Sequence, residues 1–429
     1  MNAVITDLFY WVSIALMICI HAGFLAYEVG ASRSKNVLAS AMKNLLTFSV
    51  VISTFFFFGW WFYYAFPQFP VDALDTVGAE LALPWSDDSG PNVASVNGIF
   101  WGAFALFAAT TGSIMSGAVL ERIRTSAFLI LTTVLGSVVW IIGAAWAWHG
   151  NGWMLTEWGW HDFGAAGCVH LIAGTFTLGV LINLGPRIGR FVDGKAVTIP
   201  PHNLPLTMLG LMLIFVGFFG FLMGCVVYTN EGYFSIFGNP TNLSAIAFST
   251  LMGLSGGIMG AYIASKGEPF WTISGGLAGV ISVAPGMDLY HPALAFIIAV
   301  VGGALIPFIG KFIEKFGIDD VVGAVTVHGG CAFYGLVVSG FVLWGYPNVG
   351  DLPSINPAGQ IGGAVVLALL GFVPGYLISL ALKSAGLLRI PLEVEVAGLD
   401  LSEVPATPYP EGIPVTVLRE TVVIEEVNR

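Results

Sequence analysis

Long apolar runs dominate the chain, and short polar segments separate them. Eleven runs approach or exceed the ~20 residues that a helix needs to cross a bilayer. They lie near residues 4–30, 37–65, 96–119, 125–149, 162–185, 203–228, 238–264, 268–286, 291–311, 321–345 and 356–385. The pattern predicts an all-α polytopic membrane protein of eleven transmembrane helices. Residues 1–385 would form the membrane domain.

Composition supports a membrane protein. Apolar residues make up 56% of the 429 residues and charged residues only 10%, whereas soluble domains carry about 25% charge. The run after Asp7 is too long for a signal-peptide core and lacks a small-residue cleavage site, so we interpret it as the first helix. The four cysteines lie in apolar runs without CxxC spacing, which favours buried thiols over a disulfide framework or a zinc site. We expect no metal and no cofactor.

Basic residues occupy alternate connections between the predicted helices. They are Arg33, Lys35, Arg122, Arg124, Arg187, Arg190, Lys195, Lys266, Lys311, Lys315, Lys383, Arg389, Arg419 and Arg429. The other connections carry acids, among them Asp72, Asp87, Asp288 and Asp351. Because positive charge resists translocation, the basic side should be cytoplasmic. The sequence therefore predicts an N-terminus outside the cell, and a cytoplasmic tail over the acidic, proline-containing residues 386–429.

Two similar segments place ionisable residues inside predicted helices. Asp162 precedes His170 by eight residues, and Asp320 precedes His328 by eight, with Val before each histidine. The segments belong to the fifth and tenth helices, which enter the membrane from opposite sides. This relation is typical of an inverted-topology repeat, here five plus five helices over about 4–185 and 203–345. Residues 356–385 would be an extra helix.

The two histidines are candidates for a central pathway. Eight helical residues rise ~12 Å, which places each imidazole near the middle of the membrane, where ionisable groups are costly and usually functional. The alternative is that each is a packing residue with a satisfied neighbour. Each aspartate also stands at a helix N-terminus, where we expect it to act as an N-cap. Uncharged imidazoles between apolar walls suit a small polar molecule, or a cation that gives up its proton, because burying a bare ion is costly.

Aromatic residues are plentiful near the predicted outer side, and they include Phe107, Trp148 and Phe221. Aromatic rings can hold a cation against their faces for about 0.5–2 kcal/mol each. The alternative is an ordinary interfacial belt of aromatic residues.

Several segments resemble the Amt/Rh family of ammonium transporters, Amt branch. They are Gly23–Gly30 with Arg33–Asn36 and Lys43–Asn44, Glu121–Arg124, His149–Met154, Trp160–His170, Asp319–His328, and in the tail Gly398–Glu403 and Tyr409–Gly412. The resemblance covers nearly the whole chain. It implies a homotrimer in a bacterial or archaeal inner membrane, with one pore per subunit and ammonium or ammonia as substrate.

The resemblance also implies roles for individual residues. Phe107 and Trp148 match aromatics of the family's external ammonium site, and Asp162 matches the aspartate that shapes this site. Phe221 matches the second ring of a stacked phenylalanine gate.

His170 and His328 match the family's twin histidines. The implied mechanism is recruitment of ammonium, loss of its proton and passage of ammonia past the imidazoles. The proton either crosses separately or is left behind.

The sequence departs from the family at three places. Cys225 stands where many members have a serine that binds the recruited ion, and a thiol is the poorer acceptor. Ala103 stands where another phenylalanine is common, with Phe104 beside it. In the tail, Val404 replaces a frequent histidine, and this replacement speaks against a P-II-type signal protein as a partner.

Two functions follow from these observations. The first is an ammonium transporter or channel. The alternative is an ammonium-sensing membrane module with little transport, whose tail would pass a signal to a downstream domain beyond Arg429. The sequence has no P-loop, no dinucleotide-binding motif and no nucleophile elbow, so an enzyme is not expected. The lack of a basic patch speaks against nucleic-acid binding.

Overall fold

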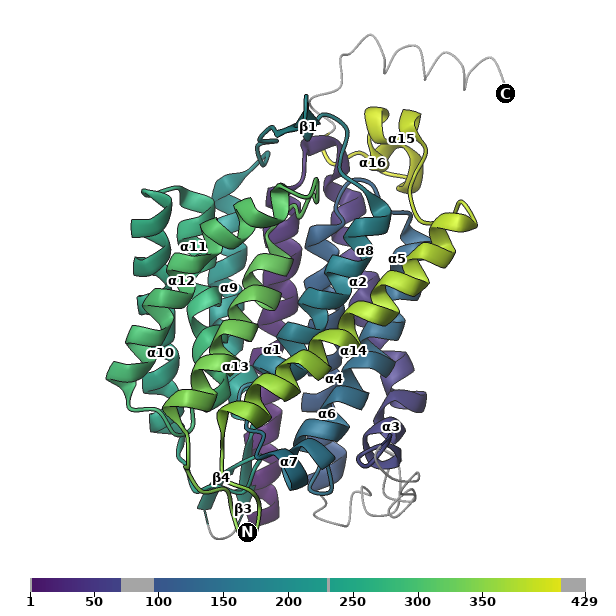
Figure 1. Ribbon diagram of the computed structural model, residues 1–429. Coiled ribbons are helices and arrows are strands. Elements are labelled where there is room, and N and C mark those ends of the chain that lie inside the picture. Colours follow the sequence, from purple (N-terminus) through teal and green to yellow (C-terminus); the bar gives the residue numbers. More distant parts are fainter. Residues whose placement is uncertain (1, 71–95, 230–231, 410–429) are drawn as a thin grey trace, which may run out of the picture.

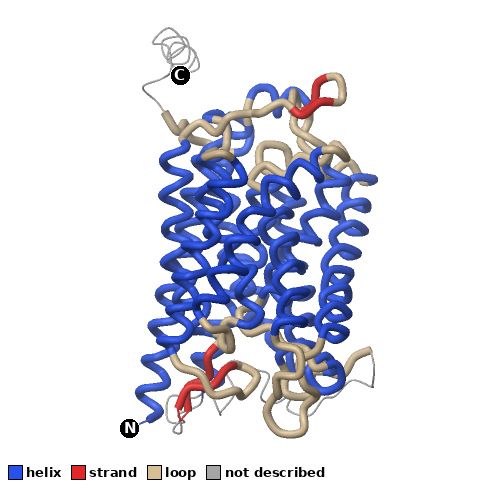
Figure 2. The backbone as a smooth tube through the Cα atoms, turned by 60° about the vertical axis from the view of Figure 1, so that its left-hand side comes forward, coloured by secondary structure: helices blue, strands red, loops and turns tan. Residues whose placement is uncertain are grey.

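The computed structural model describes residues 2–70, 96–229 and 232–409. Long helices stand side by side in one bundle, with connections at its two ends (Figures 1 and 2). The helices are α1 (Asn2–Ala31), α2 (Val37–Thr54), α3 (Trp60–Ala65), α4 (Val96–Ala118), α5 (Thr125–Val134), α6 (Trp140–Trp148), α7 (Trp153–Trp158), α8 (Ile172–Leu184), α9 (Leu204–Gly224), α10 (Leu243–Ser265), α11 (Pro269–Val283), α12 (Pro292–Glu314), α13 (Cys331–Val342), α14 (Pro357–Ser384), α15 (Leu392–Ala397) and α16 (Leu399–Glu403).

Wider, π-helical turns extend several of these helices. Phe55–Gly59 joins α2 to α3, and Leu135–Val139 joins α5 to α6, while Ala166–Leu171 leads into α8 and Val325–Gly330 into α13. Among the described residues, nine helical segments, counted with the π-turns that extend them, are long and apolar enough to cross a membrane. The helices α4 and α11 run through the bundle beside them (Figure 1), so the described residues do not contradict the predicted eleven.

Some predicted boundaries are wrong. The expected helix over 203–228 ends at Gly224 and gives way to strand β3 (Val226–Thr229), which pairs antiparallel with β4 (Gly232–Ser235). The sequence Val-Val-Tyr-Thr of β3 consists of residues that favour strands. The expected helix over 321–345 begins only at the turn that starts with Val325. A second hairpin, β1 (Phe191–Val192) with β2 (Lys195–Ala196), and the short α7, α15 and α16 were not predicted.

The packing of the two halves follows the same scheme. Helix α1 lies along α9, the first helix of the second half. In the first half α2 packs against α4 and α5, and in the second half α10 packs against α11 and α12. The helix α8 contacts the π-turn before α13, and α13 reciprocally contacts the π-turn before α8. This reciprocity is what an inverted repeat predicts.

Glycines allow the helices to approach at backbone distance. A Cβ on Gly257 of α10 would lie 2.0 Å from the carbonyl oxygen of Gly275 in α11. A Cβ on Gly303 of α12 would lie 2.1 Å from the carbonyl oxygen of Gly257. In a lipid environment such small-residue contacts take the place of hydrophobic association. The glycine content therefore reflects close helix packing.

The basic connections gather at one end of the bundle, together with the tail helices. The N-terminal end of α1 lies at the opposite end (Figure 1). Both carboxylate oxygens of Asp400 in α16 accept hydrogen bonds from α2, one from the amide of Leu38 at 3.1 Å and the other from Ala39 at 2.8 Å. The Nζ of Lys43 lies 3.5 Å from Glu403. The acidic residues of the tail thus dock it onto the start of α2, where Asp400 caps free backbone amides.

A buried carboxylate, Asp319, organises the basic end. Arg187 donates to it from Nε at 2.8 Å and from Nη2 at 3.1 Å, and Arg190 donates from Nε at 3.2 Å. Arg122 donates to its main-chain oxygen at 2.5 Å. Burial raises the pKa of Asp319, but the charge of Arg122 and the hydrogen bonds and charge of Arg187 outweigh it and hold the pKa well below its usual range.

This arrangement predicts a pH-dependent contribution to stability. Asp319→Asn should lower the free energy of unfolding by about 3–5 kcal/mol at neutral pH, because it removes the carboxylate charge that pairs with the buried guanidinium of Arg187. A depressed pKa stabilises the fold above the unfolded-state value of about 3.9, and the contribution is lost as pH falls toward the folded value. Thermal unfolding in detergent should show a difference between wild type and variant that is constant above about pH 5 and shrinks in acid. A constant difference at all pH values would contradict this.

Candidate functional site

The imidazoles of His170 and His328 meet in the interior of the bundle. Their Nδ1 atoms lie 2.9 Å apart, and the ring planes are tilted by 33° with centroids 5.0 Å apart. The residues are 1% and 6% exposed. Each histidine lies in a π-turn, His170 in Ala166–Leu171 and His328 in Val325–Gly330. One hydrogen bond therefore joins equivalent positions of the two halves.

Aspartates fix the starts of both histidine segments. The Oδ2 of Asp162 accepts hydrogen bonds from the amides of Gly167 at 2.8 Å and Cys168 at 3.1 Å. Asp320 accepts from the amides of Ala324 at 2.9 Å and Val325 at 2.8 Å. Both aspartates thus satisfy orphan amides at a helix start, which is the capping role that the sequence predicts for them.

Glycines bring the two histidine segments together. A Cβ on Gly174 of α8 would lie 2.3 Å from the amide nitrogen of Gly329 and 2.5 Å from its Cα. Because Gly329 follows His328 directly, any side chain at position 174 would push the second histidine segment away from the first. The distance between the imidazoles therefore depends on this contact.

Aromatic rings cover the histidine pair on the side of the N-terminal end of α1. The ring of Phe221 lies nearly parallel to His170, with centroids 5.8 Å apart and an angle of 24°. Phe107 meets Phe221 edge to face at 4.5 Å. Trp148 lies 5.8 Å from Phe107, and its Nε1 donates to the main-chain oxygen of Asp162 at 2.8 Å. All of these side chains are buried.

Two residues that sequence reasoning did not assign also belong to this aromatic group. Phe104 lies 5.8 Å from Phe107 and 5.9 Å from Trp148, and Phe218 lies 6.0 Å from His170. Phe104 stands beside Ala103, and its ring contributes to the same cluster. Phe218 could have been found from the sequence, because it lies three positions before Phe221 in the same helix and therefore on the same face.

Among the described residues, the hydrogen bond of the Cys225 thiol is to the main chain of its own helix. Its Sγ donates to the main-chain oxygen of Phe221 at 3.5 Å, and the residue is fully buried at the end of α9. Cys225 therefore lies one turn from the ring of the proposed gate, beside the aromatic group.

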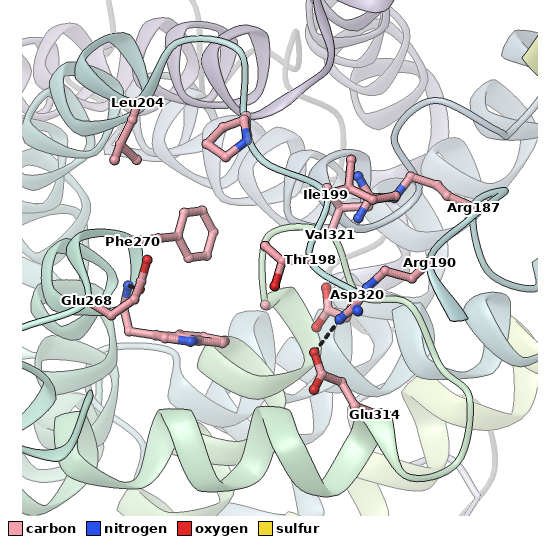
Figure 3. Close-up of a pocket in the computed structure, with 14 residues that line it drawn as sticks. Arg187, Arg190, Thr198, Ile199, Leu204, Glu268, Phe270, Glu314, Asp320 and Val321 are labelled. Carbon is pink, nitrogen blue, oxygen red and sulfur yellow. Dashed lines mark hydrogen bonds and ion pairs between the residues drawn. The ribbon is translucent and has the colours of Figure 1, made fainter. Parts of the chain in front are cut away.

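A narrow cavity lies on the other side of the histidine pair. Its lining is mostly apolar, with polar groups from Tyr27, Ser274 and His328. Near it, toward the basic end, is an inner vestibule of about 300 Å³. Figure 3 shows this vestibule with Arg187, Arg190, Glu314 and Asp320 on one side, Glu268 and Phe270 on the other, and the ion pair of Arg190 with Glu314.

The fold and this arrangement define a class: a polytopic helical membrane protein with a buried, aromatic-capped histidine pair, as expected of a transport protein. Comparison with known proteins identifies the family. Residues 8–409 match the model of the Ammonium Transporter Family, and the chain belongs to this family.

Archaeal transporters are among its similar proteins. The chain is 32% identical to ammonium transporter Amt1 of Methanocaldococcus jannaschii over 414 residues, which is 96% of this chain and 98% of that protein. It is 31% identical to Amt2 of the same organism, over 95% of this chain and 92% of that protein. The resemblance seen in the sequence is therefore confirmed.

Solved structures share the fold. A sensor Amt protein superposes with a TM-score of 0.78 at 27% identity, over 94% of this chain and 98% of that one. Candida albicans Mep2 superposes with a TM-score of 0.75 at 22% identity, over 95% of this chain and 92% of that one. Nitrosomonas europaea Rh50 has a TM-score of 0.69 at 19% identity, over 99% and 97%. The last two likenesses concern the fold alone.

The glycine contact predicts a sensitive position. Gly174→Ala should lower stability by about 1–3 kcal/mol, as overpacking does, and should separate the imidazoles, because its Cβ meets backbone that has no free end to move. Thermal unfolding in detergent measures the first effect. Gly150→Ala is the matched control, since a Cβ there has nothing within 4 Å. Equal stability of the two variants would refute the role of the contact.

Proposed function

We propose that the chain conducts ammonium nitrogen across the membrane along the axis that passes through the histidine pair. Ammonium is recruited beside Phe107, Trp148 and Asp162, loses its proton, and passes Phe221 as ammonia. The family membership supports the substrate class. The observation that carries the proposal is the hydrogen-bonded pair of buried imidazoles, 2.9 Å between Nδ1 atoms.

The chemistry of the pair suits an uncharged passenger. In a neutral imidazole one ring nitrogen donates and the other accepts, so a bond between two Nδ1 atoms requires one ring to donate and the other to accept. The Nε2 of His170 has no hydrogen-bond partner among the described residues. It is therefore free to exchange a hydrogen bond with ammonia, which both donates and accepts.

The aromatic group is suited to recruiting ammonium and to excluding hydrated ions. The faces and edges of Phe107 and Trp148 can attract a small cation, whereas Phe221 over His170 closes the path to hydrated ions. A cation cannot shed its water into this apolar lining without a large desolvation cost. Selection would therefore come from deprotonation before the gate.

The orientation in the membrane follows from charge. The end that carries the tail helices and the paired arginines would be cytoplasmic, and the aromatic group would face outward. The inner vestibule would then be the exit. A homotrimer, and binding of a P-II-type protein or signalling domain to the tail, remain predictions from the resemblance.

Replacement of one imidazole tests the proposal. His170→Ala should reduce uptake about tenfold or more, because a lost buried hydrogen-bond partner costs about 1–3 kcal/mol and 1.4 kcal/mol is a factor of ten. The measurement is growth on low ammonium of a strain that lacks its own ammonium transporters, with membrane insertion checked by immunoblot. His291→Gln, at an exposed helix start, is the control.

The outcome of the same experiment with wild type decides between functions. Growth that depends on His170 supports conduction. If the well-inserted wild-type chain fails to support growth, the transport proposal is wrong and the sensing alternative is favoured.

A second prediction concerns the outer site. Cys225→Ser should lower the half-saturating ammonium concentration about tenfold, because a hydroxyl accepts a hydrogen bond from a cation better than a thiol and such bonds contribute about 1.5–3 kcal/mol. Concentration-dependent uptake into proteoliposomes measures this. Cys19→Ser, in the half-buried middle of α1, should leave the value unchanged. An unchanged value for both variants would place Cys225 outside the recruitment site.

A further inference from the structure

A buried pair of one histidine and one aspartate lies near the aromatic group. The Nε2 of His161 and the Oδ1 of Asp288 are 3.0 Å apart, and both side chains are fully buried. The remaining atoms that could form hydrogen bonds, Nδ1 of His161 and Oδ2 of Asp288, have no such partner among the described residues. Buried polar atoms are normally paired, so these two atoms remain able to form a hydrogen bond with a further group.

The position of the imidazole is fixed by its surroundings. The side chain of Gln360 in α14 grips the backbone of His161, accepting from its amide at 2.9 Å and donating to its carbonyl at 2.7 Å. Gln360 also donates to Ser339 at 2.6 Å. The ring of His161 lies against Phe237 with centroids 4.5 Å apart. These contacts hold the ring in one orientation.

The pair is joined directly to the outer site. His161 precedes Asp162, whose carbonyl accepts from Trp148. The amides of Phe163 and Gly164 donate to the carbonyls of Pro285 and Ala284 at 3.0 and 2.9 Å, which brings the segment of Asp288 beside that of His161.

Several titratable groups face the pair. The charge of Asp288 acts on Cys225 and on Tyr290, and Asp162 follows His161 directly in the chain. The pair therefore lies within electrostatic reach of the place where ammonium would be recruited.

The chemistry of the pair is that of an oriented base. An ionised carboxylate only accepts hydrogen bonds, so the bond to Asp288 requires the proton of neutral His161 to be on Nε2. The lone pair is then on Nδ1. A histidine oriented by a carboxylate, with its other nitrogen free, is suited to accept a proton, and the carboxylate stabilises the imidazolium that forms.

We propose that His161, oriented by Asp288, accepts the proton that ammonium loses at the outer site. This inference rests on the proposed function. An N–H bond of ammonium breaks and leaves its electron pair on ammonia, while a new N–H bond forms at Nδ1 of His161. The positive charge moves to the imidazolium beside Asp288. Water at the outer face then takes the proton and restores the neutral ring.

The test is the initial rate of ammonium-driven transport in proteoliposomes, measured with an internal pH dye at external pH values where ammonium remains the dominant species. Wild type should slow as the medium is acidified, because protonated His161 accepts no proton. His161→Gln should be about 100-fold slower, the lower end of what a general base contributes, and should lose this pH dependence.

Variants of Asp288 separate positioning from mere packing. Asp288→Asn can still accept from Nε2 but lacks the charge that stabilises the imidazolium, so its acid decline should move to lower pH, with a slower maximum. Asp288→Glu should restore the wild-type profile. A packing role would change the amount of inserted protein but not the pH of the decline.

His291→Gln and Asp351→Asn, both exposed residues, should keep the wild-type rate and profile. If wild type conducts and His161→Gln keeps its rate and pH profile, the inference is wrong and the proposed function stands. If wild type itself does not conduct, the proposed function fails. If His161→Gln does not insert, an unchanged profile of Asp288→Asn overturns the inference.

Discussion

The hydrogen bond between His170 and His328 is the constraint on which the rest of the architecture depends. It joins two segments that belong to different halves and begin at opposite ends of the bundle. Each segment is fixed at its start by an aspartate that accepts amide protons, and the backbones meet at Gly174 and Gly329. In an apolar interior the bond has no water to replace it, so the halves must hold it in register. The aromatic group and the inner vestibule take their places on either side.

The helices, the basic end and the repeat can be predicted from the sequence because their signals are strong and local. Apolar length predicts the helices, alternation of basic connections predicts that they gather at one end, and the recurrence of Asp162…His170 in Asp320…His328 predicts the repeat. The capping role of both aspartates could also be inferred from position alone. Spacing cannot show that the imidazoles bond through Nδ1, because that depends on tertiary packing.

Other features could not be predicted for physical reasons. The end of α9 at Gly224 is decided by a hairpin partner that begins at Gly232, outside any hydropathy window. The pairing of His161 with Asp288 joins residues 127 positions apart, and neither belongs to the repeated motif. The docking of Asp400 onto α2 depends on a tail whose composition alone predicts only a cytoplasmic extension.

The π-turns that carry both histidines have a consequence for how such a chain can change over evolution. A π-turn holds one residue more than the α-helical turn it replaces. Loss of that residue would restore regular geometry and swing everything beyond it by about 100°, turning one imidazole away from the other and toward neighbouring helices. Insertions and deletions should therefore accumulate in the surface connections, and the length between each capping aspartate and its histidine should stay invariant even where the intervening side chains differ, as they already do between the two halves of this protein.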